Sequence, residues 1–479
     1  MLFSSTIFLF LFLPFTLLLY FISPKKLKNV ILLVASLFFY AWGEMQYVII
    51  MILSILINYI TGLKIDKHQK AKNKKSSKIA LIIGITLNLL LLCYFKYANF
   101  LLDNFNIFIN YFNLEAIEYK KIHLPIGISF FTFQAISYIA DVYRKEVKVQ
   151  KNFWNLALYI SLFPQLIAGP IVRYNSVAKE INNRTHSVDA TAEGIRRFIR
   201  GLGKKVLLAN PMGEIADTVF ALSTIELNPI VTWIGIICYS LQIFFDFAGY
   251  SDMAIGLGKI FGFNFPENFN FPYIAKSIKE FWRRWHISLS TWLKDYLYVP
   301  LGGNKLGATR TYINLLIVFI LCGFWHGASW NFIIWGLYQG FFLIIERMKF
   351  GKRLEQTSSF FQHFYMIFVI LIGWVLFRSE TMSQAGIYIA NMFAITKSTE
   401  IPLDLYMLLN NFSYTCFAFA ILLCMPFASW SKNKLTIKIN KKYHGAFVLS
   451  RDLWLILIMI FSIIRIAAGT HNPFIYFRF

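Results

Sequence analysis

Long apolar runs, separated by short polar and basic stretches, recur along the whole chain. Runs without Lys, Arg, Asp or Glu occupy residues 2–23, 79–95, 122–140 and 453–464. These runs come near or exceed the length of helix that crosses a bilayer core of about 30 Å. The pattern therefore predicts an all-α polytopic membrane protein. The first run lacks the basic start and small-residue cleavage site of a secretory signal, so we expect it to be retained.

The basic residues lie between the apolar runs, mainly in residues 64–78 and 432–451. Cytoplasmic loops of membrane proteins are rich in Lys and Arg, so we place both segments in the cytoplasm of a bacterial inner membrane. Lys25, Lys26 and Lys28 follow the first run. Their position predicts an extracytoplasmic N-terminus, and the single apolar run after residue 451 predicts an extracytoplasmic C-terminus.

Alternation of the two membrane faces fails at residues 153–172. Before that point, residues 29–63 are expected to form two short helices joined at residues 42–44, and residues 79–95 a span followed by an outer segment at 99–121. Residues 153–172 contain Pro164 and Pro170 and have basic stretches on both sides. This arrangement is typical of a broken, re-entrant segment beside a cavity. We expect about ten to twelve spanning or re-entrant elements, divided into a transmembrane core, residues 1–452, and a C-terminal helix, residues 453–479.

Composition excludes several other classes of protein. Hydrophobic residues make up 57% of the 479 residues and charged residues 15%, which is unlike a soluble protein of this length. The formal net charge of +23 follows from the basic loops, so we assign the lipid bilayer, and no nucleic acid, as the partner of those charges. The 5 cysteines lack the spacing of a metal site or disulfide framework, and we expect buried thiols and no metal.

Residues 277–300, SIKEFWRRWHISLSTWLKDYLYVP, carry the first candidate chemistry. At 100° per residue, Trp282 and further aromatic side chains share one arc of a helix, whereas Arg283, Arg284 and Lys294 lie elsewhere. The pattern predicts one amphipathic helix at the membrane surface. His286 falls at the edge of the apolar arc, where it either anchors the helix at the interface or takes part in a site.

The second candidate is His326 in the stretch CGFWHGASWN, residues 322–331, between two apolar runs. An ionisable residue at membrane depth is costly and indicates function, although a histidine bonded to a carbonyl at a helix end is the structural alternative. A sheltered histidine can take the proton of a hydroxyl that attacks an acyl carbon. Trp325 is its neighbour, and Asn331 or a backbone carbonyl is a candidate to orient its ring. The chain has no G-x-S-x-G elbow, P-loop, dinucleotide fingerprint or H-E-x-x-H motif.

Several stretches of the chain resemble the membrane-bound O-acyltransferase (MBOAT) family, in the bacterial branch that modifies cell-surface polysaccharides. They are LPIGISFFTFQAISYIADVYR, FPQLIAGPIVRY, FFDFAGYSDMAIG, EFWRRWHISLSTWLKDYLYVPLGGNK and FWHGASWNFIIWG. The resemblance implies a ring of tilted transmembrane and re-entrant helices around a central funnel and tunnel. It also implies that His326 is catalytic, with His286 as the second histidine of the site. A thioester donor on the cytoplasmic side, with acetyl-CoA as co-substrate and no bound cofactor, is implied as well.

Within this branch, alginate and peptidoglycan O-acetyltransferases resemble the chain in length and motifs. In the D-alanyl transferases of teichoic acid, an ending similar to FIYFRF, residues 474–479 here, lies on a separate small protein. The fused ending favours acetyl transfer, and we favour peptidoglycan over alginate as acceptor. The resemblance further implies an extracytoplasmic SGNH-type partner and makes Tyr476 a candidate acyl carrier. An aromatic membrane belt with Arg478 at the headgroups is the structural alternative for this ending.

Other functions remain open at this point. A transporter or flippase would also use a broken helix and an intramembrane cavity, and a structural subunit could dock a partner without chemistry. Within the enzyme class, acetyl could pass directly from donor to acceptor without a covalent carrier. The arginines and Lys294 are candidates to meet donor phosphates, with lipid headgroups as the alternative.

Overall fold

The computed structural model describes residues 1–167, 169–395, 400–427, 444–469 and 472, and every element in these ranges is a helix. The chain divides into two compact units. Unit 1 comprises Met1–Thr191, Leu257–Pro266 and Gly327–Ser329. Unit 2 comprises Ala192–Gly256, Glu267–His326 and Trp330–Phe479. Among the described residues, six helices are long and apolar enough to cross a membrane, and the all-α polytopic prediction is confirmed.

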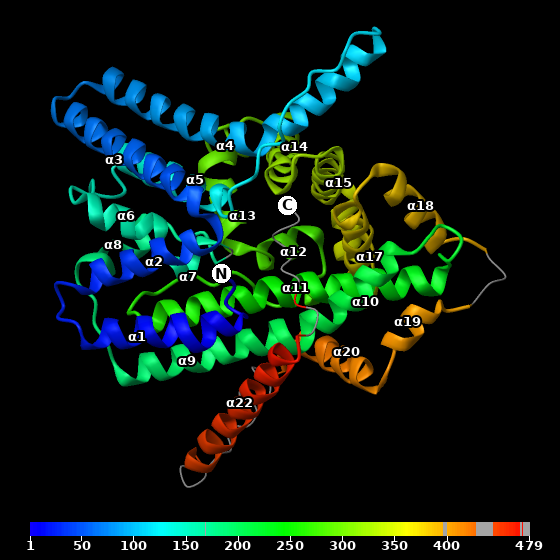
Figure 1. The fold of residues 1–479 in the computed structure, drawn as a ribbon. Coiled ribbons are helices and arrows are strands. Elements are labelled where there is room, and N and C mark those ends of the chain that lie inside the picture. Colours follow the sequence, from blue (N-terminus) through cyan, green and yellow to red (C-terminus); the bar gives the residue numbers. More distant parts are fainter. Residues whose placement is uncertain (168, 396–399, 428–443, 470–471, 473–479) are drawn as a thin grey trace. The chain divides into compact units, whose positions relative to one another are not determined.

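Unit 1 is built from helices that follow one another closely in the sequence. Helices α3, α4 and α5 pack against one another, as Figure 1 shows in blue to cyan. The bounds of the unit 1 helices are η1 Phe8–Phe12, α1 Leu13–Ile22, α2 Lys28–Glu44, η2 Met45–Tyr47, α3 Val48–Lys70, α4 Lys74–Tyr111, α5 Ile128–Arg144, α6 Phe153–Ser161, α7 Phe163–Leu166 and α8 Tyr174–Asn182.

A pair of asparagines joins α3 to α4. Asn58 Nδ2 donates to Asn88 Oδ1 at 2.9 Å, and Asn88 Nδ2 donates back to Asn58 Oδ1 at 3.0 Å. Both side chains are fully buried. Polar side chains in apolar surroundings hold helices together when they satisfy one another, so this reciprocal pair fixes the relative rotation of the two helices.

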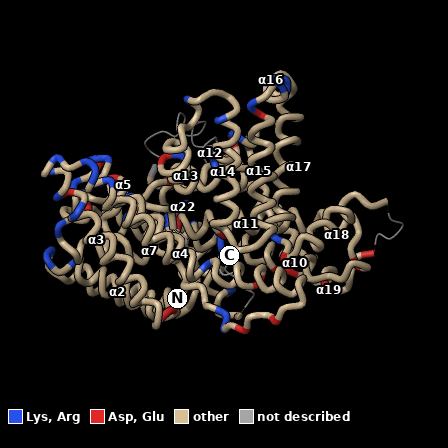
Figure 2. The backbone as a smooth tube through the Cα atoms, turned by 90° about the horizontal axis from the view of Figure 1, so that it is seen from above, with Lys and Arg blue, Asp and Glu red and all other residues tan. Residues whose placement is uncertain are grey.

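A turn is present close to the expected position, but α2 continues through residues 42–44 and the turn is η2, Met45–Tyr47. The two helices are not both short, because α3 has 23 residues. The basic segment at residues 64–78 joins α3 to α4, and Figure 2 shows Lys and Arg gathered at that end of the pair. The outer segment expected at 99–121 is wrong in part, since α4 continues as helix to Tyr111. Asparagines interspersed with apolar residues continue the helical pattern beyond residue 95. An argument from hydropathy alone ends at residue 95, because the apolar run ends there.

The proline-containing segment at residues 153–172 is broken as predicted. Helix α6 has 9 residues and α7 has 4, too short to cross a bilayer. Tyr159 donates its hydroxyl to the Val172 carbonyl at 2.9 Å, and Gln165 Nε2 donates to the Tyr159 carbonyl at 2.5 Å. These side chains satisfy backbone groups that the break leaves without helical partners.

Unit 2 contains the remaining helices, with the first residues of α9 and the last of α11 assigned to unit 1. Helices α14 and α15 pack along each other, and α15 also packs on α17 (Figure 1). The bounds are α9 Val188–Gly203, η3 Lys204–Ala209, α10 Asn210–Ala221, α11 Pro229–Ile260, η4 Pro272–Ile274, α12 Ile278–Arg284, α13 Ile287–Leu293, η5 Lys294–Tyr298, α14 Ala308–His326, α15 Trp330–Arg347, α16 Lys349–Glu355, α17 Ser359–Arg378, α18 Met382–Met392, α19 Leu403–Leu408, α20 Asn411–Leu423 and α22 His444–Ala467.

Glycines set the close approach of α14 and α15. A Cβ atom on Gly323 would lie 2.1 Å from the Phe332 carbonyl oxygen, and one on Gly336 would lie 2.2 Å from the Phe319 carbonyl oxygen. Small residues allow two helix backbones to meet in this way, and dense packing then holds the pair. His326 ends α14 one turn after Gly323, so this contact also sets the position of the histidine.

A buried ion pair joins η3 to α11. Lys205 Nζ lies 2.8 Å from Asp246 Oδ1, and the two side chains are 2% and 1% exposed. Charges are costly at membrane depth unless they are paired, so this contact holds the π-helical turn against α11. Cysteines follow the prediction except for Cys93, which is exposed, whereas Cys238, Cys322, Cys416 and Cys424 are buried.

Candidate active site

The amphipathic segment at residues 277–300 is not one helix, so that prediction is wrong. Helix α12 ends at Arg284, α13 begins at Ile287, and His286 lies in the break with φ 42° and ψ 56°. A non-glycine residue in this left-handed region costs about 1–2 kcal/mol. Strained backbone of this kind is concentrated at functional sites, and the break turns the imidazole inward instead of along a helix surface.

His286 is buried, with 4% of its surface exposed. Its Nδ1 atom has no hydrogen-bond partner within the described parts of the chain. Burial lowers the pKa of His286 to about 3, so its imidazole is neutral near pH 7. A neutral imidazole can accept a hydrogen bond, which is the state that an orienting residue needs, whereas so low a pKa makes it a weak general base near pH 7.

His326 lies at the C-terminal end of α14, surrounded by aromatic rings. Its ring centroid is 4.9 Å from that of Trp325, 5.3 Å from Trp335 and 5.1 Å from Phe377. These rings stand edge to face with the imidazole, at interplanar angles of 71–87°. The packing limits rotation of the His326 side chain, which is half-buried.

The two histidines line one small cavity of about 10 Å³, although 40 positions separate them in the sequence. Apart from the imidazoles, its walls are aliphatic and aromatic: Ile243 and Phe247 of α11, Trp285, Trp335 of α15, and Trp374 and Phe377 of α17. The structure therefore brings His286 and His326 together, as the motifs imply for an active site. We call this cavity the histidine chamber.

A larger cavity of about 500 Å³ shares both histidines with the chamber. Its inner part is apolar and includes Leu315, Val318, Phe319 and Cys322 of α14. Exposed cations line its outer part, and no Asp or Glu lines it in the part of the chain that the structure describes; these cations are Lys279, Arg283, Lys294 and Arg347. We call this cavity the cationic cavity. It suits a ligand with an anionic end and a narrow, apolar or neutral end.

The predicted basic residues separate into two groups. Arg283 and Lys294 line the cationic cavity. Arg284 instead pairs with Glu280 at 2.8 Å and donates from Nη1 to the Asn270 carbonyl at 3.1 Å. Arg284 is therefore part of the scaffold around His286 and not of the cavity.

The other supporting residues have these positions. Trp282 lines the cationic cavity, and its Nε1 donates to Gln339 Oε1 at 3.3 Å. Asn331 Nδ2 donates to the Ser379 carbonyl at 2.7 Å, which links α15 to the end of α17. A role for Asn331 in orienting His326 stays a prediction. Tyr476 lies outside the described residues, so its role stays a prediction as well.

Sequence reasoning missed the aromatic walls of the histidine chamber. Trp335 is 1% exposed and Trp374 is 2% exposed, and their rings stack at a centroid distance of 6.4 Å. Trp335 stands at the end of the FWHGASWNFIIWG stretch, so that motif contained a signal. Trp374 and Phe377 come from an ordinary apolar helix, and nothing in their local sequence distinguishes them from other buried aromatic residues.

This arrangement is suited to acyl transfer. The cationic cavity can hold an activated acyl donor, and the His326 imidazole can accept the proton of an attacking hydroxyl. The apolar walls keep bulk water from the reacting carbon and limit hydrolysis.

Comparison with known proteins agrees with this description. The profile of the MBOAT, membrane-bound O-acyltransferase family, matches residues 34–383. The chain is 40% identical over 492 residues to the probable alginate O-acetylase AlgI of Pseudomonas putida, with 100% of both chains covered. It is 45% identical over 394 residues to the protein of the same name from Azotobacter vinelandii, covering 82% of this chain and 78% of that one. It is also 39% identical over 425 residues to the peptidoglycan O-acetyltransferase of Helicobacter pylori, covering 80% and 78%.

Proposed function

Because the chain belongs to the membrane-bound O-acyltransferase family and is a multi-pass acyltransferase, we propose that it moves acetyl groups from a cytoplasmic thioester toward a cell-surface polysaccharide. The observation that carries this proposal is the pair of histidines shared by the chamber and the cationic cavity. Acetyl-CoA is the proposed donor, because its phosphates match the cations at the outer part of the cavity and its pantetheine arm matches the inner part.

In the proposed reaction, a hydroxyl oxygen attacks the thioester carbonyl carbon. His326 accepts the hydroxyl proton as the carbon–oxygen bond forms, and the carbon–sulfur bond breaks. The thiolate then takes that proton from His326 and leaves as the free thiol. His286, neutral and facing the same chamber, accepts a hydrogen bond from the attacking group or orients the thioester.

The proposed attacking group is the phenol of Tyr476, which would carry acetyl to the extracytoplasmic face. An SGNH-type partner would take the acetyl group onto a serine and pass it to a sugar hydroxyl. This relay depends on extracytoplasmic placement of the C-terminus in the inner membrane, as the basic loop at residues 432–451 predicts.

The acceptor that we propose is alginate or a similar exopolysaccharide. The two relatives named as alginate O-acetylases, at 40% and 45% identity, support this choice over the earlier preference for peptidoglycan. Peptidoglycan is the second candidate, supported by the relative from Helicobacter pylori at 39% identity.

The test of the acyltransferase site is His326→Ala, with His123→Ala as the matched control. The side chain of His123 is 62% exposed and lies in unit 1. We expect His326→Ala to abolish thiol release from acetyl-CoA and acetylation of the polysaccharide while the protein is still inserted in the membrane, and His123→Ala to be unaffected. Normal acetylation by His326→Ala would contradict the proposal. A transporter or docking subunit would show no thiol release even in the wild-type protein.

Mass spectrometry of products identifies the acceptor. Base-released acetate from purified exopolysaccharide and from muropeptides is compared between cells with and without the protein. Loss of acetate from the exopolysaccharide alone supports the first candidate, and loss from muropeptides alone supports the second.

A further inference from the structure

A short loop after α11 meets the helix break that contains His286. The loop comprises residues 267–271, and Asn268 at its centre is 2% exposed. We propose that Asn268 is a positioning residue that holds His286 in its inward, left-handed conformation. It does so through hydrogen bonds to Ile287 and Ser288, the two residues that follow His286. This inference deepens the proposed function, because it rests on His286 taking part in acyl transfer.

Asn268 binds the start of α13 through three hydrogen bonds. The Ile287 N–H donates to the Asn268 carbonyl at 2.8 Å. The Ser288 N–H donates to Asn268 Oδ1 at 3.2 Å, and the Ser288 hydroxyl donates to the same oxygen at 2.9 Å. The first N–H groups of a helix have no partner within the helix, so Asn268 caps α13 from outside its own segment. His286 occupies the N-cap position itself and contributes no side-chain cap.

The same loop also binds the residues before His286. The Asn270 N–H donates to the Arg284 carbonyl at 2.9 Å, and Arg284 Nη1 donates to the Asn270 carbonyl at 3.1 Å. The chain is therefore held on both sides of His286. With the flanking backbone fixed, the histidine keeps a φ of 42° that an unconstrained histidine would leave.

His286 needs such support because its own side chain provides little. Nδ1 has no hydrogen-bond partner in the described part of the chain, so no bond at this atom selects the orientation of the ring. The neighbouring ring of Phe269, at a centroid distance of 6.1 Å, comes from the same loop. The loop therefore supplies both the backbone anchor and a ring beside the imidazole.

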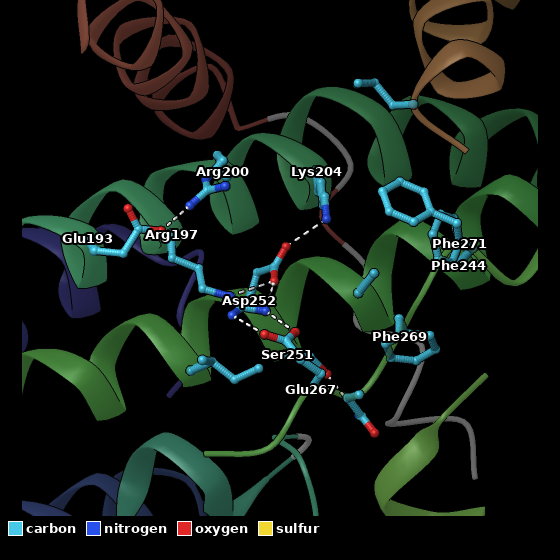
Figure 3. A pocket seen from close by; sticks show the side chains of 14 residues that line it. Glu193, Arg197, Arg200, Lys204, Phe244, Ser251, Asp252, Glu267, Phe269 and Phe271 are labelled. Carbon is cyan, nitrogen blue, oxygen red and sulfur yellow. Dashed lines mark hydrogen bonds and ion pairs between the residues drawn. The ribbon is translucent and has the colours of Figure 1, made fainter. Parts of the chain in front are cut away.

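Unit 2 anchors Asn268 in turn. Asn268 Nδ2 donates to Ser251 Oγ of α11 at 3.0 Å, and Ser251 precedes Asp252. Figure 3 shows Arg197 of α9 between Asp252 and Glu267, the residue before Asn268. Arg197 Nη1 donates to Glu267 Oε1 at 2.6 Å, and Arg197 Nη2 lies 2.9 Å from Asp252 Oδ1.

These charged residues line a separate pocket of about 310 Å³, which Asn268 also lines (Figure 3). Each cation of the pocket has an acidic partner: Arg197 with Asp252 and Glu267, Arg200 with Glu193, and Lys204 with Asp252. Because the charges are matched, the network serves better as a fixed support for the loop than as a site for an anionic ligand.

The test compares Asn268→Ala with Asn270→Ala. Asn270 is an exposed asparagine in the same loop, and the hydrogen bonds described for it use only its main chain. We measure thiol release from acetyl-CoA by the full-length protein in membranes. Asn268→Ala should lower kcat by about tenfold to 100-fold with little change in KM for acetyl-CoA, because the histidine is displaced while the cations of the cationic cavity stay in place. Asn270→Ala should match the wild-type protein.

Two further variants separate positioning from a general loss of structure. Asn268→Asp keeps the oxygen that accepts from Ser288 and should recover most of kcat. In a His286→Ala background, Asn268→Ala should cause no further fall, because its effect acts through His286. Should Asn268→Ala fail to accumulate, Ser288→Ala removes one of the three bonds and should lower kcat several-fold.

An unchanged kcat in Asn268→Ala or Ser288→Ala, or an equal fall with and without His286, would overturn the inference. Failure of the proposed function looks different. In that case His326→Ala retains thiol release, whatever the activity of Asn268→Ala. If only the positioning role is wrong, His326→Ala is inactive and Asn268→Ala is normal.

Discussion

The glycine contact between α14 and α15 gives a prediction whose size follows from the structure. In Gly323→Ala the new Cβ would lie 2.1 Å from the Phe332 carbonyl oxygen, whereas ordinary contacts begin at 3.4 Å. That oxygen belongs to a helix backbone and cannot rotate away, so the two helices must separate by roughly 1 Å. Overpacking of this kind costs about 1–3 kcal/mol, against a gain of up to about 1 kcal/mol in helix propensity.

The same shift should reach the active site. His326 follows Gly323 by one helical turn, and a misplacement of about 1 Å can reduce a reaction rate by about 100-fold. We therefore expect Gly323→Ala to lower both thermal stability and kcat for thiol release. Stability is measured by the temperature at which the detergent-solubilised protein loses its monodisperse elution peak, and kcat with acetyl-CoA as donor.

Gly386→Ala is the matched control, because Gly386 lies in α18 and a Cβ atom there meets nothing within 4 Å. This variant should keep full activity and gain up to about 1 kcal/mol from helix propensity. If Gly323→Ala is as stable and active as the wild-type protein, α14 and α15 do not pack as closely as described, and the reasoning that ties this contact to His326 is refuted.

Three further predictions concern the charges and the carrier. Below about pH 6.5 His286 is protonated in the unfolded chain, whereas it stays neutral in the folded protein down to about pH 3. The titration of His286 therefore leaves the free energy of unfolding unchanged above pH 6.5 and lowers it as the pH falls further. His286→Gln should therefore lose less thermal stability than wild type between about pH 7 and about pH 5, and an equal loss would contradict this reasoning. Arg283→Gln should raise KM for acetyl-CoA by up to about fivefold, an effect that weakens at high salt, while Arg284→Gln should not; equal KM values for both would remove the cationic cavity from donor binding. Tyr476→Phe should keep donor binding but lose acetylated polysaccharide, and full acetylation in this variant would leave the ending a membrane anchor.

Much of the fold could be predicted because apolar run length is a direct physical requirement of the bilayer. The turn between α2 and α3 and the break after α6 follow from Gly, Pro and charge positions. The length of α4 could not be predicted in this way, because its continuation to Tyr111 depends on helix propensity and local hydrogen bonds outside the apolar run. For example, Asn104 Nδ2 donates to the Phe100 carbonyl at 2.7 Å, a local bond that hydropathy does not report.

The site could be predicted only as two separate histidines. Helical periodicity placed His286 on a continuous helix, because aromatic and apolar residues recur at helical spacing on both sides of it. The break is imposed from a distance, by Asn268 and Asn270 of a loop that precedes α12. Long-range hydrogen bonds of this kind leave no local signal. The aromatic walls of the histidine chamber could not be predicted for the same reason, since Trp374 packs at the chamber only after α15 and α17 have come together.

A histidine that activates a hydroxyl can also activate water, so the walls of the histidine chamber decide which reaction occurs. The chamber, about 10 Å³, has room for about one water molecule. A buried water needs two to four polar partners, and the chamber offers the two imidazoles and the Nε1–H of Trp335, which has no hydrogen-bond partner among the described residues. A water there has only these few groups to hold it, whereas a hydroxyl attached to a carrier arrives with its own binding energy. The aromatic walls therefore favour acyl transfer over hydrolysis, and the strained placement of His286 keeps the second imidazole within the same small chamber.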